Sequence, residues 1–233
     1  MMRSRNTRVR GDAVAPIEGV TVEGSDYSPG TGSNLLLYSE ELDNTDAWTI
    51  QTPLVLGVTA DTETEPLTST TTADTFTRID GNSAGNNQDS GIQQEFPVTS
   101  GTTYCFSVYY TYYNLRNWFR GFQMSFDNTY FAADTFTNFV LPQDTTTPSV
   151  SATDNANGAV EDVGSGWYRM SIYATATDTG NANVDMRITT STSTSYRGTW
   201  YSRDGYGYYA WGMQVNEGTE PGDYTKTTNV RIT

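Results

Sequence analysis

The clearest pattern of apolar and polar positions lies in residues 101–113, where the two kinds of side chain alternate with a period of two. One set of alternating positions is almost wholly apolar or aromatic: Tyr104, Phe106, Val108, Tyr110 and Tyr112. The interleaved set is mixed: Cys105, Ser107, Tyr109, Thr111 and Tyr113. Successive side chains of a strand point to opposite faces of its sheet. The pattern therefore predicts a strand with one face on a core and the other available for contacts.

The same alternation predicts further strands with core-facing sets, namely Phe122, Met124 and Phe126; Tyr168, Met170 and Ile172; and Tyr209, Trp211, Met213 and Val215. Shorter strands are expected at 53–58, 73–79, 92–98, 130–136 and 184–190, whereas 61–72 and 141–165 are expected to be irregular. No helix of useful length is predicted. About ten strands between Gly-rich turns are typical of an all-β, two-sheet antiparallel jelly-roll sandwich. We expect this single domain to span 34–217, with an extended N-terminal arm at 1–33 and a C-terminal tail at 218–233.

Composition supports the all-β prediction and narrows the partners. Hydrophobic residues make up 36% of the chain, and 16 Tyr, 9 Phe and 5 Trp carry much of that share, as suits pleated surfaces. The net charge is −14, and the four arginines of residues 1–10 contribute +4, so the remaining residues carry −18. A body so acidic repels nucleic acid and anionic membranes. No transmembrane segment or signal peptide is expected.

The basic N-terminal arm is predicted to dock on a partner. Its cationic side chains are Arg3, Arg5, Arg8 and Arg10, and its apolar side chains Ile17, Val20 and Val22 could add a short strand to a neighbour. The alternative is a solvated terminus without a partner. We favour docking.

Four stretches, taken in order, resemble a jelly-roll domain found in structural proteins of tailed bacteriophages and related to carbohydrate-binding modules. They are residues 34–40 with Trp48, residues 73–76, residues 98–108, and residues 166–169 followed by 209–215 and 220–225. The aromatic run 109–113 departs from the small, polar or basic continuation usual in that family. The resemblance implies a non-enzymatic accessory structural protein of a virion, assembled in the host cytoplasm.

The resemblance leaves three functions open. The first is a tail fibre or appendage for host adhesion, anchored by the arm to other virion proteins. The second is a capsid-decorating protein whose surface aromatics form subunit contacts. The third is a glycan-binding module of a larger enzyme system. A symmetric homo-oligomer, for which we expect a trimer, suits a virion.

Aromatic side chains outside the predicted core faces are the candidates for binding host surface glycan, because sugar C–H faces stack on rings. They are Tyr109, Tyr113, Trp167, Tyr173, Trp200, Tyr201, Tyr206 and Tyr208. The alternative is that these rings fill a sheet–sheet or subunit interface, where Tyr and Trp are also enriched.

Catalysis and cofactor binding are not expected. The chain has no His and one Cys, which excludes Ser-His-Asp and Cys-His nucleophile arrangements, an intrachain disulfide and His-ligated metals. Acids that a glycosidase could recruit show no marked pairing: Glu95, Asp127, Asp134, Glu161, Asp185 and Asp204. The loops 80–91 and 154–158 leave a structural calcium as a minor alternative. The arginines of the body are expected to pair with carboxylates between subunits: Arg78, Arg116, Arg120, Arg169, Arg187, Arg197 and Arg203.

Overall fold

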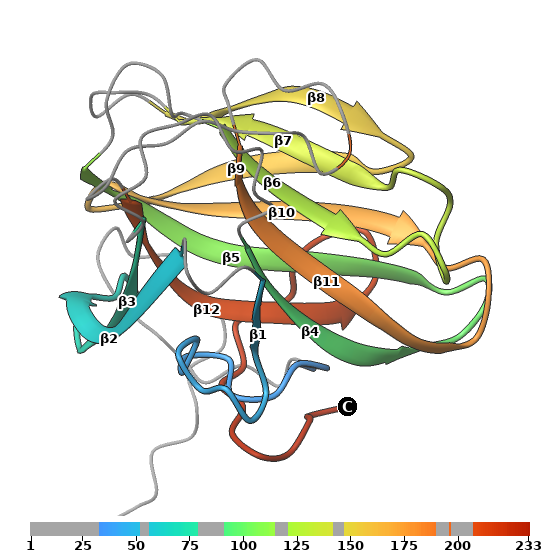
Figure 1. Cartoon of the computed structure of the whole chain (residues 1–233), viewed down its shortest axis with the longest axis horizontal. Helices are drawn as coiled ribbons and strands as arrows, with labels where there is room; N and C mark the ends of the chain where they lie inside the picture. Colours follow the sequence, from blue (N-terminus) through green and yellow to red (C-terminus); the bar gives the residue numbers. More distant parts are fainter. Residues whose placement is uncertain are drawn as a thin grey trace, which may run out of the picture.

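The computed structural model describes residues 33–51, 56–78, 91–114, 121–141, 147–189, 196 and 207–233. These residues form two antiparallel six-stranded sheets (Figure 1). Sheet I has the order β1 (Thr49–Gln51), β4 (Gly91–Val98), β11 (Gly180–Thr189), β6 (Gly121–Phe126), β7 (Phe136–Val140) and β8 (Ser149–Asp154). Sheet II has the order β2 (Leu56–Thr64), β3 (Thr71–Arg78), β12 (Gly207–Glu217), β5 (Thr103–Asn114), β10 (Trp167–Thr175) and β9 (Asn157–Gly164).

The chain passes repeatedly from one sheet to the other, so strands that are neighbours in sequence are often in different sheets. Strand β4 belongs to sheet I and β5 to sheet II, and β11 and β12 are divided in the same way. Sequence-distant strands are therefore neighbours, as with β5 between β12 and β10. The prediction of an all-β, two-sheet antiparallel jelly-roll sandwich is confirmed.

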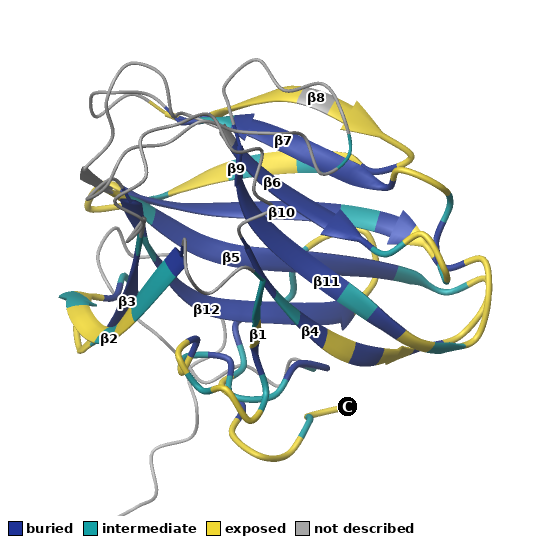
Figure 2. Cartoon of the chain, in the orientation of Figure 1, coloured by how far each residue is buried: buried dark blue, intermediate teal, exposed yellow. Residues whose placement is uncertain are grey.

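The core lies between the sheets, and the predicted alternation supplies much of it. The apolar faces of β5, β6 and β10 are buried there, with Phe106, Phe122 and Met170 at 0% exposure. The prediction is wrong for Tyr112, which lies near the end of β5 and is 44% exposed. The ring of Tyr208 stacks on Phe76 at a centroid distance of 5.1 Å. Figure 2 shows that the central strands are largely buried, whereas β8 and β9 along one edge are mostly exposed. Burial of these apolar and aromatic side chains stabilises the sandwich.

The predicted faces of β12 are wrong in one half of the strand because the strand contains a bulge. Its register against β5 shifts between Trp211 and Gln214, and Gly212 between them has a φ of +62°. An extra residue in one strand reverses the side-chain alternation beyond it. Met213 and Val215 therefore lie in the core as expected, whereas Tyr209 and Trp211 lie on the outward face.

The two regions expected to be irregular contain strands. Strand β2 continues to Thr64, and 141–165 contains β8 and β9 around a turn at 155–156. Both regions lie at sheet edges, where exposed Thr, Ser and Asp replace the apolar alternation that marks an inner strand. The expected strand at 130–136 is instead mostly a turn, in which the Asp127 carboxylate accepts hydrogen bonds from the backbone N–H groups of Thr129 (2.8 Å) and Tyr130 (3.1 Å).

The segment 33–48 and the residues after β12 pack together at one end of the sandwich (Figure 1). Asn34 pairs with Ile232 in an antiparallel bridge, and its side-chain amide donates to the carbonyls of Met213 (3.0 Å) and Thr225 (2.9 Å). Arg231 Nε donates to the carbonyl of Leu35 over 2.7 Å. Residues 218–233, expected as a tail, are thus packed on the body.

Candidate functional site

The outward face of sheet II carries an aromatic cluster, which we define as Tyr109, Trp167, Trp211 and Tyr224. Each member is at most 5% exposed. The ring centroids of Trp211 and Tyr224 are 4.5 Å apart, and Tyr109 lies 5.4 Å from Trp211 and 5.9 Å from Tyr224. Among these three residues the ring planes are tilted or perpendicular to one another, at angles of 50°, 57° and 86°. This geometry is typical of packing rather than of a platform with open ring faces.

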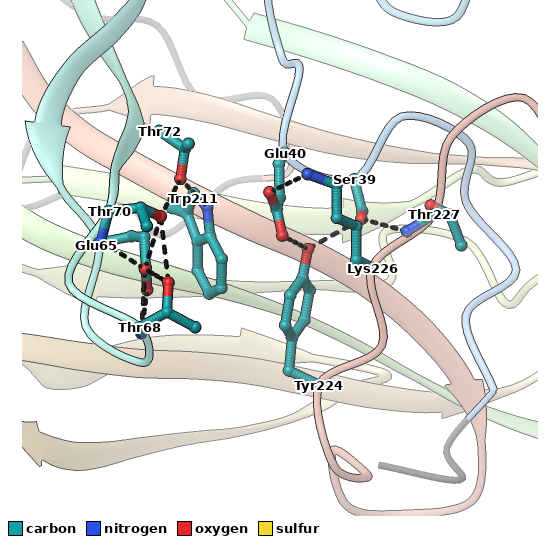
Figure 3. A network of polar contacts seen from close by, with 10 residues as sticks. All are labelled: Ser39, Glu40, Glu65, Thr68, Thr70, Thr72, Trp211, Tyr224, Lys226 and Thr227. Carbon is teal, nitrogen blue, oxygen red and sulfur yellow. Dashed lines mark hydrogen bonds and ion pairs between the residues drawn. The ribbon is translucent and has the colours of Figure 1, made fainter. Parts of the chain in front are cut away.

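Hydrogen bonds hold the polar ends of two of these rings, Trp211 and Tyr224 (Figure 3). Trp211 Nε1 donates to Thr72 Oγ1 over 3.1 Å. Tyr224 donates to Glu40 Oε1 over 3.1 Å, and its hydroxyl lies 2.9 Å from that of Ser39. Glu40 also pairs with Lys226 at 2.7 Å. The aromatic cluster therefore joins the end segments of the chain to sheet II.

The loop beside Trp211 is organised by one buried carboxylate, that of Glu65, which is 1% exposed. It accepts backbone N–H bonds from Leu67 (2.6 Å), Thr68 (2.9 Å) and Thr70 (3.0 Å), and a hydroxyl bond from Thr70 (3.0 Å). Burial alone would raise the pKa of Glu65, but the hydrogen bonds from Thr68 and Thr70 lower it overall. The loop therefore holds an ionised carboxylate.

The glycan candidates expected from the sequence fall in different places. Tyr109 and Trp167 lie together in the aromatic cluster, and Tyr173 is half-buried on the same strand as Trp167. Tyr208 was expected off the core but is 1% exposed inside it, because the bulge at Gly212 reverses the faces of β12. Tyr113 belongs to β5 by its backbone, and its side chain is not described. The remaining candidates, and all those of the arm, lie outside the described residues: Trp200, Tyr201, Tyr206, Arg3, Arg5, Arg8, Arg10, Ile17, Val20 and Val22.

The outward face of sheet I has the opposite character and carries a polar stripe, which we define as Gln51, Gln93, Asp185, Arg187, Gln123 and Asn138. These residues come from β1, β4, β11, β6 and β7, which are consecutive neighbours in the sheet. Gln123, Asn138, Asp185 and Arg187 are at most 2% exposed, whereas Gln51 and Gln93 are half-buried. The stripe thus has a buried part on the inner strands and a more open end on β1 and β4.

Hydrogen bonds join the residues of the stripe. Arg187 Nη2 donates to the carboxylate of Asp185, with which it forms an ion pair, and to Gln51 Oε1. Gln51 Nε2 in turn donates to Gln93 Oε1. Farther along, Gln123 Nε2 donates to Asn138 Oδ1 over 2.8 Å. The buried ion pair therefore orients the two half-buried amides in front of it.

Gly91 provides the space for this connection. Arg187 on β11 reaches Gln51 on β1 across β4, and Gly91 is its register partner on β4. A Cβ atom at Gly91 would lie 2.7 Å from Arg187 Cγ and 2.4 Å from the carbonyl oxygen of Met186. Only glycine leaves room for the guanidinium to cross the strand.

The sequence analysis missed most of this stripe. Arg187 was expected to pair with carboxylates between subunits, and Asp185 was considered as an acid that a glycosidase could recruit. Arg187 instead pairs within the chain. The sequence does show polar residues between apolar ones on β4, β6 and β11. Which of these polar residues meet depends on the register of five neighbouring strands.

The other acids considered for catalysis are dispersed. Glu161 lies on β9 in sheet II, and Asp134 lies in the turn before β7 with a φ of +60°. Asp127 accepts the bonds of its own turn, and Glu95 is exposed on β4. Asp204 lies outside the described residues.

The part of the chain that the structure describes shows no metal-binding cluster. Within it, no group of three or more Cys, Asp or Glu side chains is arranged to hold a metal ion. At the turn 154–158, the Asn155 amide donates to the carbonyl of Ala133 over 2.7 Å. The loop 80–90 lies outside the described residues. The described residues also contain no helix that is long and apolar enough to cross a membrane.

Comparison with known proteins finds similarity at the level of architecture. No family model matches the sequence, and no relative is found among curated proteins. The chain is similar to the CBM22-1 and GH10 modules of xylanase 10B from Clostridium thermocellum complexed with xylohexaose, at 13% identity and a TM-score of 0.39. That match covers 82% of this chain and 28% of the other, so this chain spans under a third of that two-module protein.

Two single modules are also similar. One is a xylan-binding domain from CBM family 22, at 13% identity and a TM-score of 0.42, with 82% of this chain and 98% of that one covered. The other is the C-terminal family 22 carbohydrate-binding module of C. thermocellum xylanase 10B, at 14% identity and a TM-score of 0.39, with 84% and 99% covered. These three neighbours contain carbohydrate-binding modules, and none of them is a phage structural protein.

Proposed function

We propose that this protein is a non-enzymatic glycan-binding module that holds its ligand at the open end of the polar stripe. The observation that carries the proposal is the hydrogen-bonded series Gln93–Gln51–Arg187–Asp185 on the outward face of sheet I. Sugar hydroxyls both donate and accept, so they require side chains that offer both functions in a fixed geometry. Half-buried amides held by a buried ion pair meet that requirement, because less side-chain freedom is lost when the ligand binds.

Binding without catalysis follows from the charges of the stripe. Glycoside hydrolysis uses two carboxyl groups on either side of the scissile bond. The stripe contains one carboxylate, that of Asp185, and it is buried in an ion pair with Arg187. The same arrangement that orients the amides removes this acid from proton transfer.

Retention on immobilised polysaccharides tests the proposal. Gln93→Ala and Gln51→Ala should each weaken binding about three- to tenfold, the loss expected for one hydrogen bond. Asn157→Ala is the matched control, since it removes an exposed amide from β9 in sheet II and should leave binding unchanged. The panel should include xylohexaose and other neutral oligosaccharides. Equal binding by all four proteins would refute the site, and release of reducing ends would refute the absence of catalysis.

Display on a phage particle, as a tail appendage or a capsid decoration, stays a prediction of the sequence resemblance. Deletion of residues 1–32 should leave a soluble, folded sandwich that is absent from particles. Continued incorporation of the truncated protein would contradict the docking role of the arm.

A further inference from the structure

Arg169, on the outward face of sheet II, is a buried cation without an acidic partner among the residues that the structure describes. It lies on β10 and is 7% exposed. The ion pairs in the described part of the chain are Arg187–Asp185 and Lys226–Glu40, and neither involves Arg169. Arginine is almost never this deeply buried unless it is paired.

The contacts of Arg169 orient its guanidinium but leave donors unused. Nη2 donates to Ser107 Oγ over 3.1 Å, and the guanidinium carbon lies 5.0 Å from the centroid of the Tyr109 ring. Nε is buried and has no hydrogen-bond partner among the described residues. Because Tyr109 is itself packed against Trp211 and Tyr224, the cation lies against a fixed ring.

A buried hydrogen-bond donor without an acceptor on a charged group lowers the stability of the fold, so an acidic partner for Arg169 would be expected. The chain has 27 acidic residues against 13 basic ones, so acids are plentiful. The register neighbour of Arg169 on β9 is Glu161, which is exposed and forms no ion pair with it. The guanidinium therefore has no carboxylate partner among the described residues, and a carboxylate from outside would have to bind at the 7% of Arg169 that is exposed.

We propose that Arg169 anchors a subsite for a carboxylate-bearing sugar, a uronic acid within a glycan. This inference rests on the proposed glycan binding and adds an acidic sugar as a ligand class, on the sheet opposite the polar stripe. The planar guanidinium fork matches a carboxylate. Ser107 and Ser171 place hydroxyl groups on the same face, and Trp167, two residues before Arg169, places a ring there.

A single carboxylate suits this site better than a dense polyanion. The chain carries a net charge of −14, and Glu161 lies on the adjacent strand. Repulsion by these charges grows with the charge of the ligand, whereas a uronic acid brings only one negative charge to the guanidinium.

The test compares a glucuronate-containing oligosaccharide with a neutral one of equal length, by calorimetric titration of the full chain. The wild type should bind one more equivalent of the acidic ligand than of the neutral one, because Arg169 and the polar stripe lie on opposite sheets. This additional equivalent is the preference for the acidic ligand. Arg169→Met, which keeps the side-chain length without the buried charge, should abolish that preference and leave neutral binding unchanged. Glu161→Gln should strengthen the binding of the additional equivalent, because it removes a competing negative charge.

The results separate this inference from the proposed function. Equal stoichiometry of the wild type with both ligands, or a preference that survives Arg169→Met, would overturn the subsite and leave glycan binding at the polar stripe intact. If neither oligosaccharide binds, the proposed function fails. In that case the subsite is tested by titrating the protein with sodium glucuronate and following the Nε–H NMR signal of Arg169. A saturable change in its chemical shift supports the subsite, and no change overturns it.

Discussion

Replacement of Gly212 by alanine tests whether the bulge of β12 and the aromatic cluster depend on each other. Gly212 has a φ of +62°, where a residue with a Cβ atom is strained. A Cβ atom there would lie 3.0 Å from Tyr109 Cδ2 and 3.1 Å from Tyr224 Cε2. Tyr109 packs against Trp211, and the hydroxyl of Tyr224 is bonded to Ser39 and Glu40, so neither ring can move freely.

The magnitude follows from two effects that a matched variant separates. A left-handed conformation costs an L-residue about 1–2 kcal/mol, and overpacking a fixed site costs about 1–3 kcal/mol more. Gly101 has a φ of +83°, and a Cβ atom there meets nothing within 4 Å. Gly101→Ala should therefore show only the conformational cost, and Gly212→Ala should show both.

The assay is equilibrium unfolding in urea, followed by tryptophan fluorescence, with the midpoint of thermal unfolding as a second measure. Gly212→Ala should lose about 1–3 kcal/mol more than Gly101→Ala, which is roughly 2–12 °C in the midpoint for a chain of this size. Equal losses in the two variants would show that the rings yield to the new methyl group. The inference that the cluster is a rigid joint would then be wrong.

Three further predictions concern buried ionisable groups. Burial raises the pKa of Asp74 to about 7, although its carboxylate accepts bonds from the backbone of Leu42 and Asp61. The contribution of Asp74 to the free energy of unfolding is therefore complete below about pH 4 and is lost by about pH 7. The change amounts to up to roughly 4 kcal/mol. Asp74→Asn should flatten that part of the profile of stability against pH. The pKa of Glu65 is lowered, so its stabilising contribution depends on pH in the opposite direction and is lost as the pH falls. Glu65→Gln should cost about 1–3 kcal/mol at pH 7 in urea unfolding, and an unchanged midpoint would contradict the role of this carboxylate in the loop. Burial also raises the pKa of Cys105 to about 12, so its thiol should react with a disulfide reagent only after unfolding; stoichiometric reaction of the native protein would refute this.

The sequence predicted the fold best where a strand has an uninterrupted apolar face in the core. In β5, β6 and β10 an apolar residue recurs at every second position, and the structure places those residues between the sheets, except Tyr112, which is 44% exposed. Strands β8 and β9 were missed because they form edges whose exposed residues lack that alternation. The bulge at Gly212 was missed because a single glycine between Trp211 and Met213 does not interrupt an apolar pattern. Its effect appears only in the register with β5.

The candidate site was less predictable for a related reason. Gln93, Gln123 and Arg187 each look like ordinary outward-facing residues of their own strands. They become one hydrogen-bonded series only because β4, β11 and β6 are neighbours, and because Gly91 leaves space for Arg187 to reach β1. Single-strand periodicity can indicate which face a residue occupies, but it cannot indicate which residues meet across a sheet.

The two outward faces of the sandwich explain why aromatic content alone is a poor basis for choosing a candidate binding site here. On sheet II, Tyr109, Trp211 and Tyr224 pack against one another and against the end segments, so their ring faces are already occupied. On sheet I, the residues available to a ligand are amides whose orientation is set by a buried ion pair. Trp167→Ala should therefore lower the free energy of unfolding without selectively weakening the binding of neutral glycans, whereas Gln93→Ala should do the reverse. If Trp167→Ala left stability unchanged and abolished neutral glycan binding, the aromatic face would be the binding face and the polar stripe would be structural.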